Sequence, residues 1–387
     1  MGDIEQTEIT IKVVGDIRRL PADQWNRCAG NKNPFVAHAF LAAMEESGSA
    51  TGETGWAPYH LVVEDGAGIA ACAPMYVKSH SQGEFVFDHG WAQAFERSGG
   101  RYYPKLLIAV PFTPATGPRL LVRDGLARAP MEDALIRGAI EVAKQHNLSS
   151  VNVNFPTKPE WERLGAAGFL QRTGEQFHWS NDGYDSFDDF LGALSSRKRK
   201  AIKKERRGAV ENDIEIEWLT GSALREEHWD AFFDFYTDTG ARKWGRPYLT
   251  RAFYSLISDT MGDRVLLVLA KRHGRYIAGA LNFIGEDTLY GRYWGCLEDH
   301  AFLHFELCYY QAIDYAIDHG LARVEAGAQG QHKLSRGYLP IHTYSAHWIA
   351  DDGFRRAVDN YLGQERAAVD QDIAALDEYS PFKKSGD

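Results

Sequence analysis

Several side chains that could move a proton or bind an anion gather near one glycine-punctuated segment, EAGAQGQHKLSRG, in the second half of the chain. Glu325 and His332 could take a proton from an attacking amine, and Lys333 could bind a negatively charged group. Loops that carry such groups are often functional. The residues that we predict here are Glu325, His332 and Tyr293 for catalysis, and Arg292, Trp294, Lys333 and Arg336 for substrate binding.

Each of these residues also has a structural interpretation. Glu325 could close a strand and pair with Arg292 or Arg323, and the charged loop residues could simply be solvated. Tyr293 and Trp294 lie in the strand-like segment TLYGRYWG, where aromatic side chains often belong to the core. The residue types alone leave both interpretations open.

The spacing of residues gives less support to two other kinds of site, a metal site and a cysteine nucleophile. HAFLH places His300 and His304 one helical turn apart, but no third ligand follows from the sequence, so we expect no metal. Cys296 and Cys308 lie among apolar and aromatic residues, which favours buried thiols over a nucleophile.

A second group of candidates lies in a segment of the first half that is rich in glycine, proline and aromatic residues. Long insertions of this kind in compact domains are usually functional. A third group, in TGARKWGRPY, precedes an expected helix, where an anion or an acceptor could bind. The candidates for substrate binding in these two groups are Asp88, His89, Arg101, Tyr103, Lys105, Arg242, Lys243 and Trp244.

The stretch SSRKRKAIKKERR, from Ser195 to Arg207, concentrates positive charge in a chain whose net charge is -10. Serine favours the first position of a helix, and Arg, Lys and Ala favour its interior. One helical face would carry Arg197, Lys200, Lys204 and Arg207 together. The stretch could be a solvated helix paired with acids elsewhere, an interaction arm, or a phosphate site. The candidate phosphate-binding residues are Arg197, Lys198, Lys200, Lys203 and Lys204.

Composition excludes several broad classes. The chain has 387 residues, 44% of them hydrophobic and 25% charged, as in an ordinary soluble protein with more than one domain. The negative net charge argues against general DNA binding. No apolar run approaches the roughly 20 residues of a membrane span, and we expect a cytoplasmic protein with reduced cysteines.

The two halves of the chain carry corresponding segments in the same order. ALIRGAIEVAKQHNLSSVNV aligns without gaps on LCYYQAIDYAIDHGLARVEA, a helical pattern that changes to a short strand. Earlier in each half, a strand and a Trp-bearing helix precede two strands joined by a tight turn. Such self-similarity indicates duplication of one α/β unit.

The duplication predicts a division into a first unit at 1–190 and a second unit at 212–387, joined by a basic connector at 191–211. The first unit would carry an insertion at about 90–131, and the second would end in an amphipathic helix.

The order of elements in each half resembles the GNAT acyltransferase fold, and WERLGAAGFLQRTGEQFHW is similar to that fold's late signature. Two such units in tandem resemble the FemAB-like acyltransferases, as do ARKWGRPYLTRAFY and YGRYWGCLEDHAFLHFELCYYQ. The resemblance implies α/β architecture with mixed sheets, and transfer of an acyl or aminoacyl group to an amine by direct attack. It implies a cell-wall precursor or small molecule as acceptor.

The resemblance leaves the donor open between acyl-CoA and aminoacyl-tRNA, and tRNA would then be a partner. GNAT proteins that use coenzyme A carry a glycine loop before the central helix, but here that place reads GCLEDHAFLHFE. The lack of this loop also keeps open a non-catalytic binding protein on the same scaffold.

Overall fold

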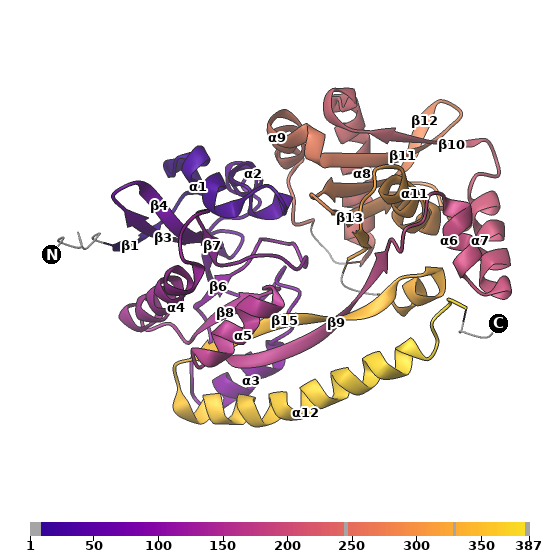
Figure 1. The fold of residues 1–387 in the computed structure, drawn as a ribbon. Helices are drawn as coiled ribbons and strands as arrows, with labels where there is room; N and C mark the ends of the chain where they lie inside the picture. Colours follow the sequence, from indigo (N-terminus) through magenta and orange to yellow (C-terminus); the bar gives the residue numbers. More distant parts are fainter. Residues whose placement is uncertain (1–8, 244–246, 328–329, 384–387) are drawn as a thin grey trace. The chain divides into compact units, whose positions relative to one another are not determined.

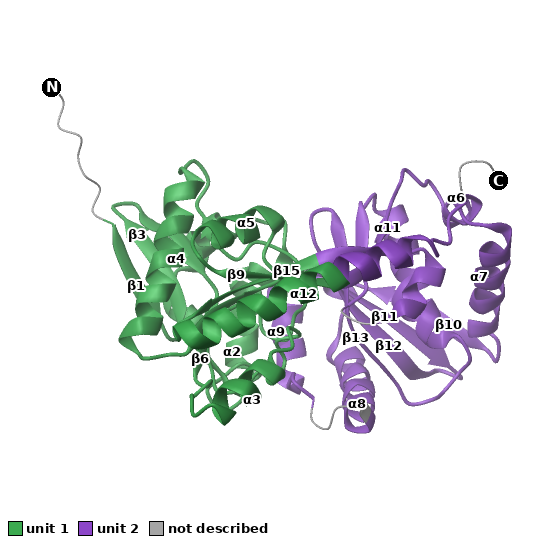
Figure 2. Cartoon of the chain, turned by 90° about the horizontal axis from the view of Figure 1, so that it is seen from below, with its two compact units in different colours: residues 1–174, 343–368 green, residues 175–342, 369–387 purple. Residues whose placement is uncertain are grey.

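The structure is a computed structural model that describes residues 9–243, 247–327 and 330–383 (Figure 1). The chain forms two compact units (Figure 2). Unit 1 combines residues 1–174 with 343–368, and unit 2 combines residues 175–342 with 369–387.

Unit 1 is built on two sheets. One has the strand order β1-β3-β4-β7, and the other contains β2, β5, β6, β8 and part of β15. These strands are β1 (Thr10–Val14), β2 (Trp56–Pro58), β3 (His60–Asp65), β4 (Gly68–Ala73), β5 (Met75–Lys78), β6 (Lys105–Ile108), β7 (Leu121–Val122), β8 (Ser150–Asn154) and β15 (Leu339–Ile349). The helices are α1 (Ala22–Ala29), α2 (His38–Glu46), α3 (His89–Arg97), α4 (Arg128–Gln145) and α5 (Lys158–Ala166).

The second sheet of unit 1 has faces of opposite character. One face supplies apolar side chains to a core that also contains Leu135 and Ala139 of α4. These apolar residues are Met75, Leu106, Ile108, Val151, Val153 and Ala346. The alternate residues of the same strands are polar yet buried, among them Lys78, Lys105, Asn152, Asn154 and His347. A buried polar face of this kind requires partners for its hydrogen-bonding groups.

Unit 2 contains one run of strands in the order β10-β11-β12-β13-β14-β9. They are β9 (Leu170–Ser180), β10 (Ile214–Leu219), β11 (Val265–Arg272), β12 (Arg275–Ile284), β13 (Thr288–Cys296) and β14 (Arg323–Glu325). The helices are α6 (Phe187–Ala193), α7 (Ser196–Ala209), α8 (Glu226–Lys243), α9 (Arg251–Met261), α10 (Leu303–Phe305) and α11 (Gln311–Asp318). A π-helical turn, Glu306–Tyr310, joins α10 to α11, and a 3-10 turn, Gln331–Arg336, follows β14.

The two sequence repeats exchange their last strands. β8 of the first repeat pairs with β15 of the second, and β14 of the second repeat pairs with β9 of the first. The sequence division at 190 and 212 therefore stays a prediction about the repeats, whereas each compact unit draws on both halves of the chain.

The mixed α/β fold with two GNAT-like units is confirmed, and α12 (Asp352–Asp377) is the expected helix near the end of the chain. Pro34 begins a 3-10 turn ahead of α2, and Pro247 lies ahead of α9, so neither proline occupies the first turn of an α-helix. No helix in the described ranges is long and apolar enough to cross a membrane.

Candidate active site

The site in unit 2 lies where β13 and β14 part. The two strands pair in parallel from Thr288 and Arg323 as far as Tyr290 and Glu325, and β13 then has β12 as its only paired strand among the described residues. We call this place, after Tyr290 and Glu325, the fork. A register shift between β12 and β13 falls at the same level and gives β13 an extra residue. Backbone groups on the freed edge of β13 can therefore face a bound molecule rather than a neighbouring strand.

Three ionisable side chains that are almost fully buried meet at the fork. Glu325 and His178 are directly opposite one another on β14 and β9, with Glu325 Oε1 3.8 Å from His178 Nδ1. Lys333 is 1% exposed and donates a hydrogen bond of 2.9 Å to the carbonyl of Gly327. Burial lowers the pKa of Lys333 to about 8, and the nearby Arg292 also lowers it. The site can thus hold a lysine that releases its proton near neutral pH.

Arg292 and Tyr293 connect the fork to α8. The Arg292 guanidinium lies 5.5 Å from the centre of the Tyr293 ring, and that ring meets Tyr236 edge-on at 5.3 Å. Burial lowers the pKa of Arg292 and raises the pKa of Tyr293. The phenol of Tyr293 therefore stays protonated and can donate a hydrogen bond to a bound carbonyl.

His332 belongs to an aromatic cluster beside the fork. It shares a hydrogen bond of 2.9 Å with the hydroxyl of Tyr309. His304 lies 5.1 Å from Trp294, ring centre to ring centre, and 5.5 Å from Tyr309. Burial lowers the pKa of His332, and the charges of Arg336 and Lys333 lower it further. A neutral imidazole in this place can accept a proton.

Arg336 is used within the protein. Its Nε and Nη2 atoms donate to both carboxylate oxygens of Glu205, at 3.1 and 3.0 Å, and its guanidinium stacks 3.5 Å from the ring centre of Phe305. Tyr310 donates a third hydrogen bond to the same carboxylate. This cluster fixes α7 to the turn that carries His332 and Lys333.

The basic stretch forms α7 as expected, and its two faces differ. Arg206 binds Glu306 and Asp314, and Lys203 pairs with Asp188 at 2.9 Å. On the exposed face, no ion pair within the described residues neutralises the following side chains: Arg197, Lys200, Lys204 and Arg207. Lys198 is half-buried and likewise has no ion pair there. A row of unneutralised cations on one helical face suits a ligand with several phosphates.

In unit 1, three of the predicted residues come together in a buried network. Lys105 is fully buried and donates to Asp88 and, at 2.9 Å each, to Glu84 and Ser81. Tyr103 joins through its hydroxyl, 2.7 Å from that of Ser81. Although burial raises the pKa of Asp88, the charge of Lys105 outweighs it and lowers the pKa to about 2.

Three other predicted residues lie apart from these two clusters. His89 and Arg101 are exposed in unit 1. Arg242 is exposed in unit 2, pairs with Asp238 at 2.6 Å and donates to the carbonyl of Cys296 at the end of β13. The position of Trp244 and the side chain of Lys243 lie outside what the structure describes.

Lys78 faces Lys105 across β5 and β6, and its amino group lies 3.7 Å from the centre of the Trp56 ring. Burial lowers the pKa of Lys78 to about 7. The unfolded chain therefore binds more protons than the folded chain between about pH 7 and the ordinary lysine pKa, so stability should rise with pH there. We expect Lys78→Met to be stabilising at pH 7, and its advantage over wild type to shrink by about 2–3 kcal/mol by pH 9. Urea unfolding at both pH values measures this, and a pH-independent difference would contradict it.

In unit 1, the place that corresponds to the fork is the end of β8, and the side chain of Arg119 occupies it. Arg119, fully buried just before β7, donates from Nε to the carbonyl of Asn154 at the end of β8 and from Nη2 to that of Ala115. Glu160 accepts the backbone N–H groups of Arg119 and Leu120 at 2.8 and 2.7 Å. These contacts satisfy the carbonyl at the end of β8 from within unit 1.

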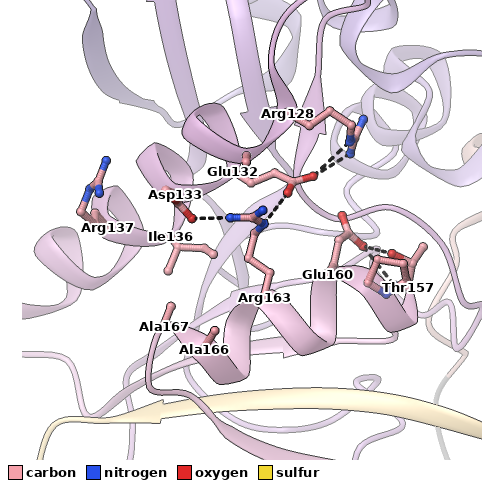
Figure 3. Close-up of a pocket in the computed structure, with 12 residues that line it drawn as sticks. Arg128, Glu132, Asp133, Ile136, Arg137, Thr157, Glu160, Arg163, Ala166 and Ala167 are labelled. Atoms are coloured by element: carbon pink, nitrogen blue, oxygen red, sulfur yellow. Dashed lines mark hydrogen bonds and ion pairs between the residues drawn. The ribbon is translucent and has the colours of Figure 1, made fainter.

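A hollow of about 910 Å³ opens in unit 1 between α4 and α5 (Figure 3). Arg163 binds Glu132 and Asp133 within it, and Arg128 binds the other oxygen of Glu132. The carboxylate of Glu132 is thus already neutralised. None of the residues predicted from the sequence lines this hollow.

The expected helical turn joining His300 to His304 is absent, because α10 begins only at Leu303. His300 instead binds Glu298 at 2.8 Å. Within the described part of the chain, no cluster of His, Cys, Asp and Glu side chains could hold a metal ion.

Sequence reasoning missed His178, Tyr309 and Glu205. A signal for the first was present, because His178-Trp179 and His347-Trp348 recur at equal spacing in the two repeats. The roles of Tyr309 and Glu205 depend on contacts between segments that are distant in the sequence, and no local pattern marks them.

Several solved structures have a fold similar to that of this chain, at low sequence identity. FemX shares 14% sequence identity with the chain at a TM-score of 0.55, covering 91% of this chain and 100% of FemX. The C-terminal domain of a putative lysylphosphatidylglycerol synthetase from Agrobacterium fabrum shares 10% identity at a TM-score of 0.56, covering 88% and 96%. L-PGS from Bacillus licheniformis shares 10% identity at a TM-score of 0.51, covering 86% and 98%. Identities this low show a common fold.

The search of curated proteins found no match. Among family models, the one named FemAB-like and described as peptidoglycan biosynthesis/recognition matches residues 16–384. That match spans nearly the whole chain, from just after β1 to beyond the end of α12. The protein therefore belongs to the FemAB-like family.

Proposed function

We propose that the chain transfers an acyl or aminoacyl group from an activated carrier to an amine at the fork of unit 2. The observation that carries the proposal is the buried carboxylate of Glu325, placed where β13 loses its partner strand. Family membership supports a transferase related to peptidoglycan, and the acceptor would be an amine of a cell-wall precursor or of a small molecule.

The reaction needs one proton acceptor and one carbonyl-binding group. The acceptor nitrogen attacks the carbonyl carbon of the donor ester or thioester, a C–N bond forms, and the bond to the carrier oxygen or sulfur breaks. Glu325 takes the proton that the nitrogen loses, and a proton returns to the leaving group. The hydroxyl of Tyr293 and the free edge of β13 would bind the developing oxyanion. No covalent enzyme intermediate is required.

Two features favour aminoacyl-tRNA over acyl-CoA as the donor. The segment ahead of the central helix of unit 2 carries Glu298 and Asp299, whose charges would repel a pyrophosphate there. The exposed face of α7 offers Arg197, Lys200 and Lys204 to a phosphate backbone. We place the reaction in the cytoplasm, where aminoacyl-tRNA is made.

The direct test incubates the full chain with aminoacyl-tRNA or acetyl-CoA and a panel of muropeptide and small-molecule amines, and detects the amide product by mass spectrometry. Product formation from either donor supports the proposal, and the donor that reacts identifies the carrier. Thermal stabilisation by an acceptor without any product would instead favour a binding protein.

Charge reversal on α7 tests the carrier-binding face. We expect Lys200→Glu combined with Lys204→Glu to weaken tRNA binding at least ten-fold and to reduce the slope of log affinity against log salt by about two. A matched control reverses two exposed cations of unit 1, Lys144→Glu with Arg356→Glu, which changes net charge equally. Filter binding at several salt concentrations measures both variants. Equal losses in both would assign the effect to net charge and remove α7 from the site.

A further inference from the structure

Asn282, on β12 beside the fork, has a buried side-chain oxygen without a partner. The side chain is 1% exposed, and its Nδ2 donates at 3.4 Å to the backbone carbonyls of Leu266 and Ala280. These contacts fix which atom of the amide is the nitrogen, because a carbonyl oxygen accepts only from a donor. The Oδ1 atom on the other side of the amide has no hydrogen-bond partner among the described residues. A buried acceptor in this state is costly, so a bound N–H donor would stabilise it.

Gly291 leaves a gap in front of this oxygen. It pairs with Asn282 across β12 and β13 at the register shift, one residue beyond the last pair between β13 and β14. A Cβ atom placed on Gly291 would have Asn282 Oδ1 at 3.3 Å and the backbone oxygen of Glu325 at 3.4 Å as its nearest neighbours. The gap therefore lies at the fork and is bordered by two acceptor oxygens.

The other two glycines within these strands have a structural explanation that Gly291 lacks. A Cβ on Gly279 would lie 2.8 Å from the side chain of Leu269, and one on Gly295 would lie 2.2 Å from the backbone oxygen of Phe235. Gly291 has no contact this short, and its φ is outside the left-handed region that favours glycine. A glycine within a strand can mark the close approach of a ligand, and that explanation fits Gly291.

The gap and the carboxylate of Glu325 lie on opposite faces of the sheet. Ala280 and Ile284, two residues to either side of Asn282, pack into the core that also contains α11. Val324 packs into the same core, so its neighbour Glu325 points to the other face, because successive side chains of a strand alternate. An amine that loses its proton to Glu325 would attack from that face. Asn282 would then face the donor.

The first repeat has no such acceptor. When the repeats are aligned on the Ile-Ala pair near the start of β4 and of β12, Pro74 takes the position of Asn282. Proline has no side-chain group that forms hydrogen bonds, and Arg119 occupies the place that corresponds to the fork. The acceptor is thus found in the repeat that carries the proposed site and not in the other.

We infer that Asn282 Oδ1 accepts a hydrogen bond from the α-amino group of the donor, so that the fork takes an aminoacyl group in preference to a plain acyl group. One carbon atom separates the α-amino nitrogen from the reacting carbonyl carbon, so a carbonyl bound at the fork brings this nitrogen beside the gap at Gly291. The amino group supplies N–H donors to a place whose nearest oxygens accept. The inference rests on the proposed function and names the chemical class of the group transferred.

The experiment compares donors that differ only in the α-amino group. One tRNA is charged with alanine or propionate, and with glycine or acetate, and kcat/KM for amide formation is measured with the full chain. Because an amino group also activates the ester, the readout is the change in preference between variants. We expect Asn282→Leu to lower kcat/KM for the aminoacyl donors roughly ten- to hundred-fold, the range for losing a hydrogen bond to a charged group. Transfer of propionyl and acetyl groups should change little.

Two further variants make the comparison specific. Gly291→Ala places a methyl group in the gap, so it should reduce the preference for aminoacyl donors even if Asn282→Leu fails to fold. Asn152→Leu is the matched control, since Asn152 is a buried asparagine of unit 1, and it should leave the preference unchanged. The melting temperature of each variant identifies any that are unfolded. Equal losses with both classes of donor in a folded Asn282→Leu or Gly291→Ala protein, or the same change of preference in Asn152→Leu, would overturn the inference.

A binding measurement separates this inference from the proposed function. If the wild-type chain transfers no group at all, the proposed function fails, and calorimetry with unreactive, amide-linked analogues of alanyl-adenosine and propionyl-adenosine then tests Asn282 directly. Wild type should bind the alanyl compound about ten-fold more tightly or better, and Asn282→Leu should bind the two compounds alike. Equal binding of the two compounds to wild type, or binding of neither, overturns the inference.

Discussion

Glu325→Gln should lower kcat by roughly 10²- to 10⁴-fold, the contribution of a positioned general base. The substitution keeps the shape of the side chain, but it replaces a carboxylate oxygen that can accept the proton with an amide NH2 group that cannot. Because Glu325 is 7% exposed, bulk water cannot easily replace it. Donor affinity should change little, since the carboxylate is expected to act on the acceptor nitrogen.

Steady-state kinetics of transfer as a function of pH measures this effect. Wild-type kcat/KM should rise with pH as Glu325 ionises, and that limb should vanish in the variant. Glu298→Gln is the control, because Glu298 is solvated and pairs with Arg272 and His300 away from the fork. Full activity of Glu325→Gln, or an equal loss in Glu298→Gln, would show that the proton goes elsewhere.

Lys105→Met should destabilise the protein by about 3–5 kcal/mol, as expected when one member of a buried ion-pair cluster is removed. The ammonium group is the shared partner of Glu84 and Asp88, whose side chains are 1% and 2% exposed. Without Lys105, two carboxylates would remain buried with no cation bound to them. Urea unfolding monitored by circular dichroism measures the change.

The pH dependence of this loss has a definite sign. In the wild type, the depressed pKa of Asp88 contributes stability above its ordinary value, and that stability is lost as pH falls toward about 2. In Lys105→Met the carboxylates can bind protons instead, so the penalty should shrink as pH falls. Lys12→Met, which breaks an exposed pair with Glu64, should cost under about 1 kcal/mol. Similar costs for the two variants would contradict the buried-network interpretation.

Local pattern was enough to predict most elements. The helical periodicity of 134–145 and of 307–318 predicted the central helices, and the serine-led basic run predicted α7. Asp88 lies just before the insertion and Lys105 lies within it, and the two side chains form an ion pair in the folded unit. Whether any of these residues bind substrate stays a prediction.

Non-local pairing was not predictable from one sequence. The residues of β9 and β15 do not show that each strand pairs with a strand of the other repeat. Their alternating patterns are compatible with pairing in either repeat. The ion pair of Arg336 with Glu205 could not be predicted, because the two residues lie 131 positions apart in the chain. Whether Arg336 also binds a ligand stays a prediction. The contribution of His178 to the fork depends on the same exchange.

The strand exchange also sets the order in which the molecule can mature on the ribosome. β8 is synthesised early, yet the strand that covers its free side, β15, leaves the ribosome almost two hundred residues later. Until then the backbone N–H and C=O groups on this edge of β8 have no partner strand. An unpaired edge of this kind can pair with other nascent chains or bind chaperones. The amino-terminal repeat therefore cannot complete its sheet until the carboxyl-terminal repeat has been synthesised, so the two repeats must fold together.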